Sequence, residues 1–130
     1  MVNEGDVQLH RNEAAATVRA LRQRVRWKPG KATAHLEKRK TLGHLSSEVA
    51  VEDYNRLIGD LVKGEGHQVY LYCFGSERYY AMRGIANGVE WLVIATRAGI
   101  VETAFPPNTM DDYLNKRGFI LLGTIQEVLT

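Results

Sequence analysis

Cysteine and long apolar runs are nearly missing from this chain of 130 residues. Its only cysteine, Cys73, cannot form an intramolecular disulfide, and zinc sites built on several thiolates are excluded as well. No apolar run approaches the roughly 20 residues that a membrane-spanning helix needs. Residues 1–6 lack the charged-then-apolar order of a signal peptide. We therefore expect a soluble domain that needs neither an oxidising compartment nor a membrane.

Several catalytic motifs are also missing from the sequence. It contains no Gly-rich phosphate loop, no Gly-x-Ser-x-Gly elbow and no His-Glu-x-x-His pair. It also has no His-x-Glu motif with a Cys-x-x-Cys partner, which argues against a zinc deaminase. Cys73 lies inside the apolar run 69–74, so we interpret it as a packing residue and not as a nucleophile.

The charge that is present is unevenly distributed. Residues 1–45 hold ten Lys and Arg against four Asp and Glu, a net charge of +6, whereas residues 46–130 hold seven against eleven, a net charge of −4. A basic first third on an acidic body is expected where one face meets a polyanion or an acidic protein. A solvated helix face with no partner would show the same pattern.

Helical periodicity dominates the first half of the chain. We expect loose residues at 1–11, a helix from a cap at Asn12 to about residue 26, and an end at Pro29-Gly30. A second helix is predicted over 33–42. A third follows Ser46-Ser47 and ends at Lys63-Gly64. These helices place the basic residues on helical surfaces.

From residue 67 onward the period changes to two and β-branched and aromatic residues become frequent. Strands are predicted over 69–74, 78–85, 90–96 and 100–105, with Asn87-Gly88 as a hairpin turn. A short helix over 110–116 and an edge strand over 119–122 complete the chain. We expect an α+β fold of N-terminal helices packed on a C-terminal antiparallel β-meander of four to five strands. Residues 1–32 form a basic helical segment and 33–130 the core of one structural domain.

One helix face carries the strongest candidate chemistry. His35, Lys38 and Arg39 stand at i, i+3 and i+4, so the predicted second helix presents them together. A histidine that titrates near neutrality can move a proton from a ribose 2′-hydroxyl, while fixed positive charges stabilise the phosphate. A metal-independent ribonuclease is therefore our leading hypothesis. A lone histidine is nevertheless more often an ordinary surface or core residue.

Thr103 is the second candidate, near the end of the last strand of the meander. Alternation places it on one strand face with Val101 and Phe105, where a β-branched residue would simply pack. Its hydroxyl could alternatively donate a hydrogen bond to a phosphate oxygen. Glu102 is expected to point the opposite way and to be solvated.

Further residues could hold the substrate. Arg83 and Arg97 could each clamp a phosphate with the planar fork of arginine, although each could equally be a surface charge. Tyr80 and its neighbouring tyrosines could stack bases, as aromatic residues on sheets do in RNA-binding modules. The alternation of side chains fits equally well with tyrosines that pack on one strand face in the core.

The order of these motifs resembles the barnase/EndoU/colicin/RelE-like superfamily of ribonucleases. The resemblance covers roughly residues 33–117 and rests on His-x-x-Lys in a helix, a Ser-led helix with Glu-Asp-Tyr, and a meander that ends in Glu-Thr-Ala-Phe-Pro-Pro. It is greatest to the toxin domains of contact-dependent growth inhibition and related polymorphic toxins. Family members often carry a second histidine at the position held here by Arg39, and Thr103 matches the late-strand Ser or Thr.

The resemblance implies that residues 33–130 form a ribonuclease-like core. His35, Lys38 and Thr103 would be catalytic, and Arg39, Arg83, Arg97 and Tyr80 would bind substrate. Such a toxin cuts RNA, commonly tRNA, to a 2′,3′-cyclic phosphate without a metal or organic cofactor. It would be delivered as part of a larger bacterial effector, act in the target-cell cytoplasm and be neutralised by a cognate immunity protein. A host activating factor is a further partner that the resemblance leaves open.

Two other classes of protein fit parts of the sequence. A non-catalytic RNA- or protein-binding module would use the same basic helix and aromatic sheet. RNA binding without cleavage would favour that alternative. An antitoxin or inhibitor of α+β build is a third hypothesis, for which the many arginines of the first helix are an awkward feature.

Overall fold

A computed structural model of the chain describes residues 4–130. Helix α1 (Glu4–Gln23) begins well before the predicted cap, and Asn12 lies inside it. The prediction of a loose segment is therefore wrong for residues 4–11, while residues 1–3 lie outside the described part of the chain. Arg11 gives one physical reason, because its Nε donates a 2.6 Å hydrogen bond to the Leu122 carbonyl and holds this part of α1 on the body of the protein.

The other predicted helices and strands occur close to their expected positions. The following elements succeed α1: β1 (Arg26–Trp27), α2 (Lys31–Thr41), α3 (Val51–Leu61), β2 (Gln68–Phe74), β3 (Glu77–Ala86), β4 (Val89–Thr96), β5 (Ile100–Phe105), α4 (Met110–Lys116), β6 (Ile120–Thr124) and α5 (Ile125–Leu129). Asn87 and Gly88 both have positive φ values, 53° and 77°, as a two-residue hairpin turn requires. The α+β class is confirmed.

The sheet differs from the predicted meander. Its strand order is β1-β5-β4-β3-β2-β6, and β1 pairs with β5 in the parallel direction, so the sheet is mixed and has six strands. The prediction of a purely antiparallel sheet of four to five strands is wrong on both points. β1 contains two residues, which is too short to show alternation in the sequence, and only its place beside β5 makes it a strand.

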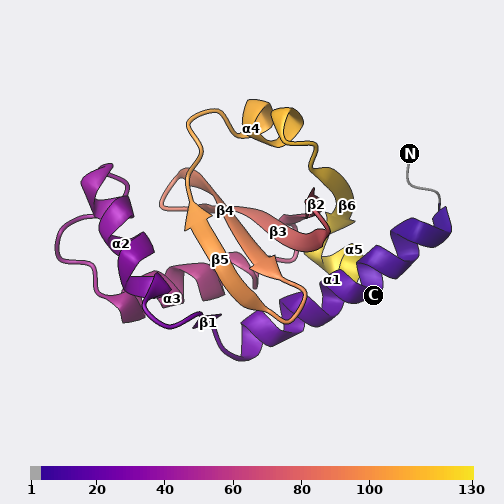
Figure 1. Cartoon of the computed structure of the whole chain (residues 1–130), viewed down its shortest axis with the longest axis horizontal. Helices are drawn as coiled ribbons and strands as arrows, with labels where there is room; N and C mark the ends of the chain where they lie inside the picture. The colour runs from indigo at the N-terminus through magenta and orange to yellow at the C-terminus, as the bar shows by residue number, and fades with distance from the viewer. Residues whose placement is uncertain (1–3) are drawn as a thin grey trace.

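The two faces of the sheet carry separate cores. The larger core lies between one face and helices α1, α3 and α5, with Leu36 of α2 at its margin. The smaller core lies under α4, where Tyr70, Ala81, Leu92 and Ile94 project from the sheet. Figure 1 shows α1 and α4 on opposite sides of the sheet and α2 near the β5 edge. We call the side that meets α4 the α4 face.

Much of the basic character of the first third has a structural use. Arg22 donates to the Val62 carbonyl just after α3, and Arg26 donates to the Ala98 carbonyl in the β4–β5 turn. Arg19 donates likewise to the Leu129 carbonyl at the end of α5. The Val62 and Leu129 carbonyls lie at helix ends, where main-chain carbonyls lack helical partners, and Arg22 and Arg19 satisfy them. Arg19, Arg22 and Arg26 therefore fasten the fold.

None of the helices within residues 4–130 is long and apolar enough to cross a membrane.

Candidate active site

Helix α2 carries three charged or titratable side chains of the site. It follows Gly30, whose positive φ of 77° turns the chain out of β1, and it runs to Thr41. Because the segment is helical, His35, Lys38 and Arg39 share one face as predicted. Arg39 is buried and His35 is half-buried, whereas Lys38 is exposed to solvent.

A bulge in β5 decides which side chains face α2. Thr103 and Phe105 pair with Ile94 and Leu92, which belong to the α4 face, whereas Val101 packs into the core on the opposite face. The prediction that Thr103 shares a face with Val101 is therefore wrong. The pairing register shifts there, and an extra residue in one strand breaks the alternation of side chains.

The extra residue of the bulge is Glu102. Its carboxylate lies close enough to His35 to raise the pKa of the histidine, in opposition to stronger effects that lower it. It also forms a 3.9 Å ion pair with the Lys28 ammonium. The Glu102 side chain is still partly exposed, as expected of a solvated residue, but the expectation that it points away from His35 is wrong. The bulge brings Glu102 into the electrostatic surroundings of His35.

His35 and Thr103 come together across the gap between α2 and β5. The His35 Nδ1 and Thr103 Oγ1 atoms lie 3.4 Å apart, in a long hydrogen bond. The Trp27 ring lies against the imidazole, with 5.4 Å between ring centroids, and its indole N–H donates to the Asn55 side chain. Trp27 also packs on Tyr54 of α3. His35 thus packs at the end of a row of aromatic rings that begins in the core.

The surroundings of His35 favour its neutral form. Burial lowers the pKa of His35 below the usual histidine value, and the positive charges of Arg39, Lys38 and Lys31 lower it further, with Glu102 opposing them. A neutral imidazole at neutral pH can accept a proton, which a general base must do. If Nδ1 carries the ring proton and donates it to Thr103, then Nε2 is the nitrogen free to act.

These charges predict how the His35 pKa responds to substitution. Lys31→Gln should raise the pKa of His35 because it removes a positive charge, and Glu102→Gln should lower it because it removes a negative one. An NMR titration that follows the His35 ring proton measures both shifts without any substrate. Equal shifts of the His35 pKa in the two variants would contradict the opposite effects assigned to Lys31 and Glu102.

Arg39 and His44 form a second pair at the carboxyl end of α2. Arg39 Nη1 donates to His44 Nδ1 over 3.2 Å, and the guanidinium lies 5.6 Å from the centre of the Phe105 ring. Burial lowers the pKa of the His44 imidazole, and the charge of Arg39 lowers it further. His44 is therefore also neutral near neutrality, with Nδ1 as its acceptor atom.

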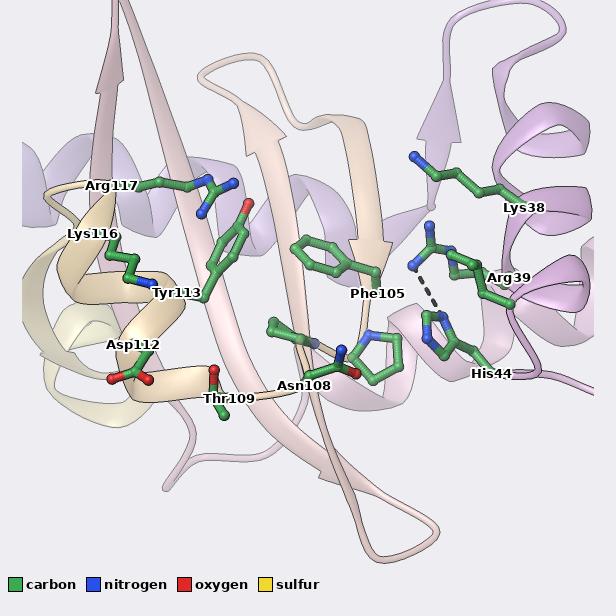
Figure 2. Close-up of a pocket in the computed structure, with 13 residues that line it drawn as sticks. Lys38, Arg39, His44, Phe105, Asn108, Thr109, Asp112, Tyr113, Lys116 and Arg117 are labelled. Carbon is green, nitrogen blue, oxygen red and sulfur yellow. Dashed lines mark hydrogen bonds between the residues drawn. The ribbon is translucent and has the colours of Figure 1, made fainter.

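A groove of about 530 Å³ extends from this pair toward α4. We call it the α2–α4 groove and define it by its lining residues: Lys38, Arg39, Leu42, His44, Phe105, Pro106, Pro107, Asn108, Thr109, Asp112, Tyr113, Lys116 and Arg117. Figure 2 shows Lys38 and Arg39 on one side, Lys116 and Arg117 on the other, and Phe105 and Tyr113 between them. Lys38 and Arg39 thus belong to both the His35 site and the groove.

Three of the predicted substrate-binding residues lie elsewhere. Tyr80 is 0% exposed and its hydroxyl donates to Glu13 over 2.6 Å, so it is a core residue and has no face free to stack a base. Arg97 forms an ion pair with the same Glu13. Arg83 pairs with Glu90 and Asp111 at 2.9 Å and 2.8 Å. Carboxylates therefore pair with both arginines. The structure places neither arginine beside His35.

Sequence reasoning missed several residues of this region. Trp27 follows the predicted first helix and His44 follows the predicted second helix, and neither belongs to a periodic segment that would have signalled its direction. Tyr113 and Arg117 fall in or just after a helix that was predicted, but the distance in sequence from α2 hid their proximity. The Glu-Thr-Ala-Phe segment is one of the motifs of the sequence. Only the bulge, however, shows which of its side chains face the site.

Comparison with known proteins adds no relative. No protein-family model matches the chain, and no curated protein or solved structure matches it either. The resemblance to the barnase/EndoU/colicin/RelE-like ribonucleases thus stays a prediction from short motifs.

Proposed function

We propose that this protein is a metal-independent endoribonuclease whose reaction centre is formed by His35, Lys38 and Thr103. The observation that carries the proposal is the contact between His35 Nδ1 and Thr103 Oγ1, made between two segments far apart in the sequence and surrounded by positive charge. A neutral imidazole beside cationic side chains suits a reaction in which a proton leaves a hydroxyl while negative charge grows on a phosphate.

The proposed step is an internal transesterification of RNA. His35 takes the proton of the ribose 2′-hydroxyl, and the 2′-oxygen forms a bond to the adjacent phosphorus. The bond from phosphorus to the 5′-oxygen breaks, that oxygen leaves with a proton taken from water, and the imidazolium of His35 returns its proton to the solvent. One product ends in a 2′,3′-cyclic phosphate and the other in a 5′-hydroxyl. The step needs no metal or organic cofactor.

Each of the other side chains has a distinct task in this proposal. Lys38 is exposed and can reach the phosphate, where its charge stabilises the additional negative charge of the transition state. Thr103 orients the imidazole, and its hydroxyl can donate to a phosphate oxygen. Arg39 is buried beneath Lys38 and supplies fixed positive charge. The resemblance to the ribonuclease superfamily supports the choice of His35, Lys38 and Thr103 as catalytic residues and of Arg39 as a substrate-binding residue.

The same resemblance supports the biological setting that we propose. The substrate would be tRNA, and the domain would be a bacterial toxin delivered into the cytoplasm of a target cell. A cognate immunity protein would then cover the cationic region between α2 and α4. We include a host activating factor in the same proposal, without assigning a surface to it.

The deciding experiment is an incubation of the purified chain with total bacterial RNA in excess EDTA. We expect discrete fragments on a denaturing gel, with 2′,3′-cyclic phosphate at the upstream ends and hydroxyl at the downstream 5′ ends. Resistance of the cyclic ends to phosphatase until mild acid opens them identifies the product. Cleavage that EDTA abolishes, or products with 5′-phosphates, would contradict the proposed chemistry.

The principal alternative is a non-catalytic RNA-binding module. The cationic and aromatic lining of the α2–α4 groove favours it, because binding does not require a proton-transfer group. RNA that is retained by the protein and remains intact in the same incubation would support this alternative.

A further inference from the structure

The α2–α4 groove combines two features that single-stranded nucleic acids require. Its walls carry four cations, Lys38 and Arg39 on α2 and Lys116 and Arg117 at α4, against one carboxylate, Asp112. Its floor carries the rings of Phe105 and Tyr113, whose centroids lie 5.1 Å apart, and the Arg117 guanidinium lies over the Tyr113 ring, 4.0 Å from its centre. Cations bind the phosphate backbone, and aromatic rings stack bases of any sequence.

We propose that the α2–α4 groove binds one nucleotide of single-stranded RNA next to the scissile phosphate, with its phosphate held by Arg39 together with Lys116 and Arg117 and its base against Tyr113. The choice of RNA as the ligand rests on the proposed function. The groove itself is a binding subsite and contains none of the proton-transfer chemistry assigned to His35.

Arg39 supplies the strongest sign that the groove receives an anion. It is only 4% exposed, and its Nε–H has no hydrogen-bond partner in the part of the chain that the structure describes. Its guanidinium points toward Phe105 (Figure 2), and its one hydrogen bond there goes to neutral His44. A buried cation with an unpaired donor is costly, and a phosphate oxygen in the groove would give the guanidinium group a charge-assisted hydrogen bond.

The aromatic residues continue beyond the groove in a connected row. Tyr113 meets Phe119 at 5.8 Å, and Phe119 stacks on Tyr72 at 4.3 Å with nearly parallel rings. Tyr72 in turn meets Phe74, which is 67% exposed at the end of β2. A row of rings that ends in an exposed phenylalanine gives bases a path across the α4 face. An acidic protein partner would explain the cations but not these rings.

The position of the groove relates it to the cleavage site. Phe105 follows Thr103 by two residues on the same face of β5, a separation of roughly 6.6 Å along a strand. Lys38 lies on both the His35 site and the groove wall. An RNA strand whose phosphate reaches His35 and Thr103 can therefore place its neighbouring nucleotide in the groove without a change in direction.

The test measures RNA binding separately from cleavage. The probe is a fluorescein-labelled single-stranded RNA of about eight nucleotides, within the usual range for stacking sites, with every 2′-hydroxyl methylated so that internal attack is impossible. Fluorescence anisotropy across a series of salt concentrations gives the affinity and its salt dependence. Because the probe cannot be cleaved, its binding is independent of whether His35 catalyses anything.

Two variants address the two halves of the proposal. The double variant Lys116→Ala/Arg117→Ala should weaken binding and reduce the log–log salt slope by about 0.7 for each phosphate that the protein no longer neutralises. Tyr113→Ala should weaken binding about fivefold to hundredfold, because the base then has no ring on which to stack. The matched control Arg56→Ala/Lys63→Ala removes the same charge from α3 and the turn after it, on the other side of the sheet, and should bind as the wild type does.

The outcomes separate this inference from the proposed function. The altered side chains of the Lys116/Arg117 variant are exposed, so their replacement does not threaten folding. Wild-type affinity in that variant would overturn the proposed subsite. Reduced affinity in that variant but not in a folded Tyr113→Ala variant would also overturn it, and would indicate that the cations bind RNA phosphates without a base stacked on Tyr113. Weakened binding in both variants without cleavage of natural RNA by the wild type would refute only the ribonuclease. Cleavage by the wild type with unchanged binding in both variants would refute only the subsite.

Discussion

Replacement of His35 by alanine should reduce RNA cleavage by about 10²- to 10⁴-fold, the usual contribution of a general acid–base group. The neutral imidazole can accept a proton, whereas the cationic groups beside it are hydrogen-bond donors with no acceptor atom. Initial rates on a fluorescent RNA substrate measure the loss. His35 is half-buried at the edge of α2, so the variant should retain the circular dichroism spectrum and cooperative melting of the wild type.

The matched control for this prediction is His10→Ala. His10 lies on α1, beside Tyr80 on the opposite side of the sheet, and its replacement should leave the rate near that of the wild type. A second variant, Thr103→Val, keeps the β-branched shape and removes only the hydroxyl, and we expect a loss of about tenfold, equivalent to one hydrogen bond. Full activity in His35→Ala would remove the proposed mechanism.

Lys38→Ala should lower kcat by about 10²- to 10³-fold and change KM much less. This pattern is expected because a charge that acts on the developing phosphate charge stabilises the transition state more than the bound substrate. Steady-state kinetics on a short RNA of defined sequence separates the two constants. Lys38→Arg retains the charge at the same place and should recover part of the lost rate.

The same helix offers a control for the lysine. Lys40→Ala also removes one positive charge from α2, but Lys40 pairs with Glu37 at 3.7 Å and does not line the groove. Its effect on kcat should be small. If the Lys38 and Lys40 variants lose activity equally, the charge of the helix as a whole matters and Lys38 has no specific role. An equal loss of affinity and turnover in Lys38→Ala would make Lys38 a binding residue.

Local patterns were sufficient for much of the fold. The period of 3.6 over α2 placed His35, Lys38 and Arg39 on one helical face, because helix geometry is fixed by the backbone. Asn87-Gly88 set the β3–β4 turn, since both residues tolerate positive φ. Alternation likewise put Tyr70, Tyr72 and Phe74 on one face of a strand. These features depend on neighbours within a few residues, and the sequence contains them directly.

The pairing of strands could not be inferred in the same way. β1 is a strand only because β5 lies beside it, and the bulge at Glu102 depends on how β5 matches β4. Both features are set by hydrogen bonds between distant segments, and each changes which side chains face α2. A one-residue shift in a strand moves the following side chains to the other face, so the surroundings of His35 were beyond local reasoning.

By itself, the sequence determined helices α2, α3 and α4, the Asn87-Gly88 turn, the α+β class and the shared face of His35, Lys38 and Arg39. Only the tertiary structure decided the use of each charge and ring: Arg22 caps a carbonyl, Tyr80 is in the core, and Arg39 is buried beside a groove. The physical reason is that residue type fixes what a side chain can do, whereas its partners are chosen by packing between segments far apart in the chain.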